Sequence, residues 1–186
     1  MIMPPRLRKL VLTAHVTSTV GWLGAVVVFL ALAIIGLTSD DAQTVRAAYL
    51  VMEPAAWLVL VPLAVASVLT GLIQSLGTVW GLFRHYWVLF KLLITVVATI
   101  VLLTYMETFR SMADLAADPR ADLSVVRNPS PLLHAALALL ALVMASVLAV
   151  FKPRGMTRYG QARQRKQRPR TTVPTGRTVD LKPDVR

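Results

Sequence analysis

The chain has 186 residues, of which 56% are hydrophobic and only 16% are charged. Because soluble domains carry about a quarter charged residues, this composition indicates a membrane protein. The length allows one compact domain, and the absence of cysteine excludes disulfides, zinc–thiolate sites and iron–sulfur clusters.

The first of four long apolar stretches runs over residues 10–37 and follows a basic N-terminal segment. Ala31 and Ala33 have the spacing of a signal-peptide cleavage site. A signal peptide, however, has an apolar core of about 7–15 residues. This apolar run is about twice that length and continues beyond the alanines, so we expect it to be retained as a membrane span.

The other three apolar stretches run over residues 54–80, 87–106 and 132–151. All four reach the length of about 20 residues that a membrane-spanning helix needs, and none alternates as barrel strands do. Short linkers make consecutive helices antiparallel neighbours. The sequence therefore predicts an all-α fold, an up-down antiparallel four-helix transmembrane bundle over residues 1–152. Pro62 is expected to kink the second span.

Residues 108–130 form the longest predicted loop and contain Pro119 and Pro129. Residues 107–117 either extend the third helix or form a short interfacial helix, and Asp118-Pro119 predicts a stop. This loop and the one between the first two spans hold seven of the nine acids. Their spacing matches no calcium-binding loop, and we interpret them as solvated. They are Asp40, Asp41, Glu53, Glu107, Asp114, Asp118 and Asp122.

Basic residues predict the orientation, because Lys and Arg accumulate in short cytoplasmic flanks. They occur in the N-terminal flank, in the link after the second span and directly after the fourth span, whereas the two acidic loops hold only four. We therefore expect a multi-pass protein of the bacterial plasma membrane with both termini in the cytoplasm.

Residues 153–186 are rich in Arg, Lys, Gln, Thr and Pro, and this composition predicts a disordered cytoplasmic tail. Although the net charge of the chain is +11, eleven of its twenty basic residues lie from Lys152 onward, in a segment with a single aromatic residue, Tyr159. We therefore expect no nucleic-acid partner. The tail either anchors the topology or lies on anionic lipid through residues 161–170. Two further alternatives are that the tail recruits a membrane-protein partner and that the protein forms a homo-oligomer.

Polar residues inside the spans lie at similar depth, about 6–9 Å from the cytoplasmic helix ends. Polar groups in a membrane are costly and mark candidate sites. Neutral imidazole can ligate haem iron or copper. Alternatively, the layer is structural packing, with Lys91 reaching toward water. The layer consists of His15, Gln74, Lys91 and Ser146. His85 and His134, in contrast, are expected in wet interfacial positions.

Enzyme signatures are absent from the sequence. It contains no GxSxG, HExxH, P-loop or Rossmann glycine pattern. No acidic residue lies well inside a span, which argues against a carboxylate proton relay. We therefore expect a protein that is not an enzyme.

Several motifs carry a family resemblance over roughly residues 10–106. The stretch from Ala14-His15 to Gly21-Trp22-Leu23-Gly24 resembles the first-helix pattern of a broad group of four-helix bacterial membrane proteins. The chain is similar to predicted integral membrane proteins of unknown function from actinobacteria. More distantly, it resembles the copper-resistance D family and four-helix protoporphyrinogen oxidases. Further matching segments are Glu53-Pro54, Val61-Pro62-Leu63, Leu69-Thr70-Gly71-Leu72, Trp80-Gly81-Leu82 and residues 86–92.

The resemblance to the oxidases implies a haem b site. A first-helix His and a third-helix Lys are associated with haem binding in those relatives, and His15 and Lys91 match these positions, with Gln74 as a neighbour. The wholly apolar residues 25–36 depart from the oxidase pattern, so oxidase activity is not implied. Copper is not implied either, because the methionines do not cluster with His15.

Overall fold

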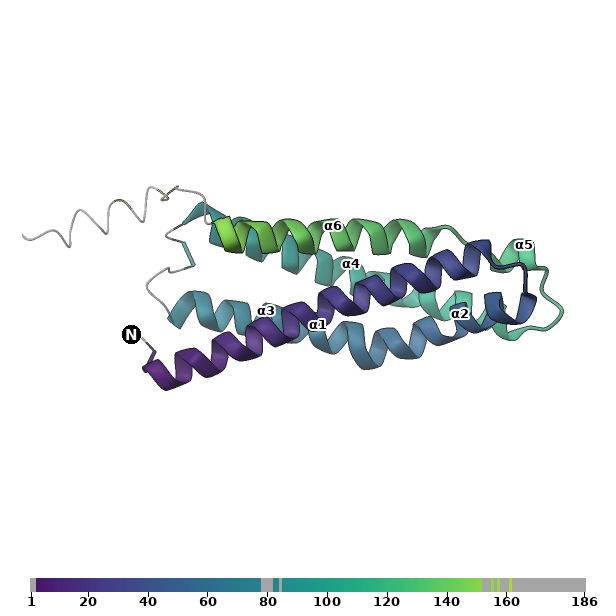
Figure 1. Cartoon of the computed structure of the whole chain (residues 1–186), viewed down its shortest axis with the longest axis horizontal. Helices are drawn as coiled ribbons and strands as arrows, with labels where there is room; N and C mark the ends of the chain where they lie inside the picture. Colours follow the sequence, from purple (N-terminus) through teal and green to yellow (C-terminus); the bar gives the residue numbers. More distant parts are fainter. Residues whose placement is uncertain are drawn as a thin grey trace, which may run out of the picture.

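The computed structural model describes residues 3–77, 82–83, 85–151, 155, 157 and 161. Within them, four long helical segments form an elongated bundle (Figure 1). Each segment is long and apolar enough to cross a membrane, so this is a multi-pass membrane protein with an all-α four-helix fold. The helices are α1 (Pro5–Thr38), α2 (Ala42–Ala55), which continues through η1 (Ala56–Leu60) into α3 (Val61–Gly77), then α4 (Tyr86–Ala117), the short α5 (Leu123–Val126) and α6 (Ser130–Phe151).

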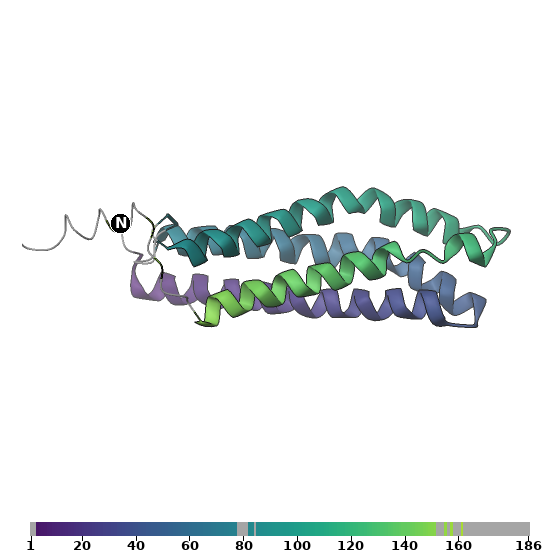
Figure 2. The ribbon, with the colours of Figure 1, turned by 90° about the horizontal axis from the view of Figure 1, so that it is seen from above.

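The four segments pack in a closed order that leaves α1 and α4 opposite each other. Helix α1 packs on α3 and α6, and α4 packs on the same two helices. The two views of the ribbon agree with this arrangement (Figures 1 and 2). Side chains from α1 and α4 therefore meet only across the interior of the bundle, which is where the candidate site lies.

Helix α2 begins at Ala42, although the sequence predicted a loop up to residue 53. The carboxylate of Asp41 caps it, accepting a hydrogen bond from the Thr44 backbone N–H at 2.8 Å. Hydrogen bonds from the Thr44 hydroxyl and backbone hold the pKa of Asp41 below its usual value. The early part of α2 is amphipathic rather than uniformly apolar, so a search for apolar runs passes over it. Its buried face consists of Val45, Ala48, Tyr49 and Met52.

A π-helical turn lies just before Pro62, at the position where the sequence predicted a kink. In η1 the backbone N–H of Val61 donates to the carbonyl of Ala56, five residues earlier. Proline lacks an N–H and crowds the preceding turn, and a single π turn is a common way to accommodate such a disturbance. The helix therefore continues through this point instead of ending there.

The end of the bundle that carries α5 is held by side-chain hydrogen bonds to backbone carbonyls. Helix α4 runs on to Ala117, the first of the two predicted alternatives, and ends at Asp118 as predicted. The Arg46 guanidinium donates to the carbonyls of Ala116, Asp118 and Ala121, at 3.2, 2.6 and 2.5 Å. Arg46, which the sequence placed in a loop, thus joins α2 to the end of α4.

Several predictions concern residues that the structure does not describe. They are the disordered tail over residues 153–186, apart from residues 155, 157 and 161, and the positions of Trp80 and Arg84. Binding of anionic lipid, of a partner protein or of a second copy through this tail therefore stays a prediction.

Candidate functional site: a polar pocket between α1, α3 and α4

Three of the four predicted polar-layer residues line one cavity of about 300 Å³. His15 reaches it from α1, Gln74 from α3 and Lys91 from α4. Ser146, the fourth, does not line it. The Ser146 hydroxyl donates instead to the carbonyl of Leu142 in its own helix, at 2.8 Å. His15, Gln74 and Lys91, which the sequence placed at similar depth in the membrane, thus meet at one cavity.

The central contact of the pocket joins His15 Nε2 to Lys91 Nζ at 3.1 Å. His15 is only 7% exposed. A hydrogen bond between two nitrogens contains a single hydrogen. If the imidazole carried a hydrogen on Nε2, the lysine would have to be a neutral amine to accept it. The two bases therefore share at most one positive charge.

Thr70 selects the tautomer of His15. Its Oγ1 lies 3.0 Å from His15 Nδ1 and donates to the carbonyl of Ala66 at 2.6 Å. A carbonyl oxygen can only accept, so this bond uses the hydroxyl hydrogen. Thr70 must then accept from Nδ1–H. In the neutral ring, the lone pair lies on Nε2, which faces Lys91.

Further hydroxyl groups join α1 to α3 beside the imidazole. The hydroxyls of Thr19 and Ser67 lie 3.0 Å apart. Thr19 and Ser18 also contact the carbonyl of His15, at 2.7 and 3.1 Å. The sequence assigned no role to Thr70. The missed signal was its spacing, three residues after Ser67 and four before Gln74, on the same helical face.

Gly71 permits the close approach of the imidazole to α3. A Cβ atom added at Gly71 would lie 3.0 Å from Cε1 of His15. A larger residue would therefore force the ring to shift by a few tenths of an ångström. Gly71 thus contributes the space in which His15 reaches both Thr70 and Lys91.

Besides three hydroxyl groups and one indole, the polar side chains that line the pocket are one imidazole, one amine and one amide. Among the described residues, no group of three or more His, Cys, Asp or Glu side chains is placed to hold a metal ion. Any iron at this pocket would therefore need most of its ligands from a prosthetic group.

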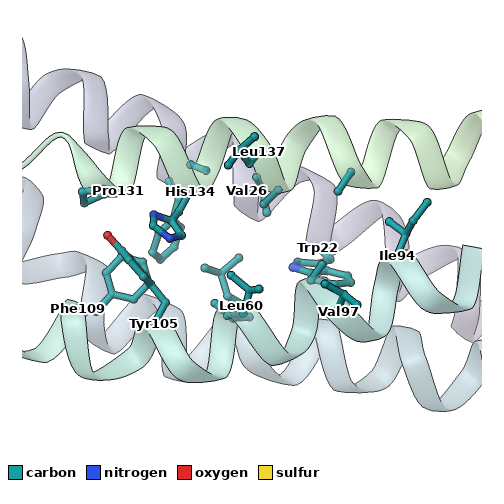
Figure 3. Close-up of a pocket in the computed structure, with 17 residues that line it drawn as sticks. Trp22, Val26, Leu60, Ile94, Val97, Tyr105, Phe109, Pro131, His134 and Leu137 are labelled. Carbon is teal, nitrogen blue, oxygen red and sulfur yellow. The ribbon is translucent and has the colours of Figure 1, made fainter.

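His134, four residues into α6, is half-buried and lines a second, apolar cavity (Figure 3). The wet interfacial position expected for it stays a prediction. Its ring stacks on Tyr105 with the centroids 4.1 Å apart. The sequence did not predict this cavity. Its lining residues are mostly apolar and show no periodic pattern of polar residues, so they are indistinguishable in the sequence from core residues.

Comparison with known proteins yields no matching family, no matching curated protein and no matching solved structure. The resemblance to the copper-resistance D family and the protoporphyrinogen oxidases therefore remains a prediction from sequence motifs.

The tight contact at Gly71 predicts a difference between two glycine substitutions. Gly71→Ala should lower the free energy of unfolding by about 1–3 kcal/mol through overpacking against His15. Gly24→Ala is the matched control, because nothing lies within 4 Å of its added Cβ. It should leave stability unchanged or raise it, since alanine favours helix. Denaturation in mixed micelles measures both, and equal stability of the two variants would contradict the geometry.

Proposed function

We propose that this membrane protein binds a b-type haem at the His15–Lys91 pocket. The observation that supports the proposal most directly is the orientation of His15. Thr70 holds the hydrogen on Nδ1, so the lone pair of Nε2 faces Lys91, and both residues line the cavity. Histidines that ligate metals usually have their other ring nitrogen engaged in this way.

The residues of the pocket suit the charge of a haem as well as its iron. Haem carries carboxylate groups, and a carboxylate inside a membrane protein needs a cation beside it. If His15 held the iron, the Lys91 amine would no longer contact Nε2 and would be available to a carboxylate of the haem. The 300 Å³ volume lies at the lower end of small-molecule sites, so the freed lysine side chain also makes room.

The proposal is one of binding and not of catalysis. Haem supplies one-electron redox chemistry when bound. Among the described residues, the lining of the pocket contains no acidic side chain, and its hydroxyl groups are those of Ser67, Ser75 and Thr95. Ser75 and Thr95 donate to carbonyls of their own helices. The chain's own contribution is therefore to hold and orient a ligand.

An absorption spectrum tests the haem proposal. Protein from haem-replete cells, purified in mild detergent, should show a Soret band that His15→Ala abolishes and Lys91→Met weakens. His85→Ala is the matched control and should retain the band, because His85 does not line the pocket. A colourless but folded wild-type protein, or a Soret band that survives His15→Ala, would overturn the proposal.

We also propose that the protein lies in the bacterial plasma membrane with both termini in the cytoplasm. The basic flanks support this orientation, and the start of α1 and the end of α6 lie at the same end of the bundle (Figure 1). The polar pocket then lies in the cytoplasmic half, and the Arg46 network lies outside.

Single cysteines test this orientation without background labelling, because the chain has none of its own. Asp40 and Arg6 are both exposed and lie at opposite ends of α1. A membrane-impermeant maleimide should label Asp40→Cys in intact cells, and it should label Arg6→Cys only after lysis. The reverse pattern would place the termini outside.

A further inference from the structure

A second cavity, of about 420 Å³, lies between α1, α4 and α6 in the half of the bundle away from His15 (Figure 3). We call it the Trp22–His134 cavity. Among the described residues, its lining is apolar except for the polar atoms of Trp22, Tyr105 and His134, and it contains no Asp, Glu, Lys or Arg. Its volume falls within the range of small-molecule sites.

His134 presents a hydrogen-bond acceptor to this cavity. Its Nδ1 lies 2.9 Å from the carbonyl of Ser130 and 3.4 Å from the Ser130 hydroxyl. The shorter contact is with a carbonyl, which can only accept, so Nδ1 carries the hydrogen. In the neutral ring, Nε2 then carries the lone pair. No residue in the described part of the chain makes a hydrogen bond to it.

The position of the His134 ring is fixed from its other side. The ring stacks on Tyr105, and the Tyr105 hydroxyl donates to Ser130 Oγ at 2.7 Å. Ser130 therefore joins the two rings into one unit. These contacts hold the His134 ring in one orientation, so the position of Nε2 in the cavity is fixed.

Trp22 presents a hydrogen-bond donor to the same cavity. It is only 2% exposed, and its indole N–H has no hydrogen-bond partner among the described residues. Figure 3 shows the indole nitrogen on the side of the ring that faces Leu60 and His134. The indole N–H is therefore available to donate to the oxygen of a ligand in the cavity.

From this arrangement we infer that the Trp22–His134 cavity binds a neutral lipid with a hydroxyl group and a second oxygen. The hydroxyl donates to His134 Nε2, the second oxygen accepts from the Trp22 indole N–H, and the apolar chain lies against the remaining lining. A plain hydrocarbon chain would leave both polar atoms unpaired. An anionic head group would find no Lys or Arg in the lining.

Fluorescence of Trp22 gives a direct test with a dibromostearoyl monoacylglycerol, whose bromines quench a nearby indole. The protein is a variant in which Trp57, Trp80 and Trp87 are each replaced by Phe, so that Trp22 is the only reporter. The matched probe is the dimethyl ether of the same lipid, which keeps the ester oxygen but cannot donate. Titrations in detergent should saturate, with the hydroxyl lipid binding about tenfold more tightly than its ether, the factor of one good hydrogen bond.

His134→Phe keeps an aromatic ring on Tyr105 but removes the acceptor. In this variant the two lipids should bind equally. Equal binding of both lipids without this substitution would show that the cavity merely takes up apolar chains, and it would overturn the inference. Quenching that does not saturate would overturn it too. Because the readout needs no haem, it is independent of the test of the His15–Lys91 pocket.

Discussion

The interior of this bundle depends on one contact between two bases, His15 and Lys91, at 3.1 Å. Inside a membrane, an ionisable side chain needs a partner from within the protein. Each of these residues is a partner of the other, and the contact limits them to one positive charge between them. Because α1 and α4 lie across the bundle from each other, the contact also sets how closely these two helices approach.

Helix α3 makes that contact possible from the side. Thr70 accepts a hydrogen bond from the imidazole and donates one to the carbonyl of Ala66. Gly71, which has no side chain, leaves room for the ring. The half of the bundle beyond Trp22 is different, because its cavity is apolar and its polar atoms lie at only a few points. The interior thus divides into a polar compartment and an apolar one, with distinct ligand chemistry in each.

The sequence predicted the four apolar helices and the convergence of His15, Gln74 and Lys91, because both follow from simple rules of helix length and depth. It missed the start of α2, since an amphipathic segment does not register as an apolar run. Thr70 carried no signal by itself, because a threonine in a membrane helix usually bonds to its own backbone. The apolar cavity was also missed, since it arises from how side chains of three helices fail to fill the space between them.

The state of the His15 ring is the most direct measure of this account. A variant with His85→Gln and His134→Gln, prepared free of haem, leaves one histidine, whose two ring nitrogens can be resolved by ¹⁵N NMR in bilayers at neutral pH. The account predicts a protonated Nδ1 and an unprotonated Nε2 that accepts a hydrogen bond, with Lys91→Met shifting Nε2 alone and Thr70→Val shifting Nδ1. A ring protonated on Nε2, or one that does not respond to Lys91→Met, would contradict it.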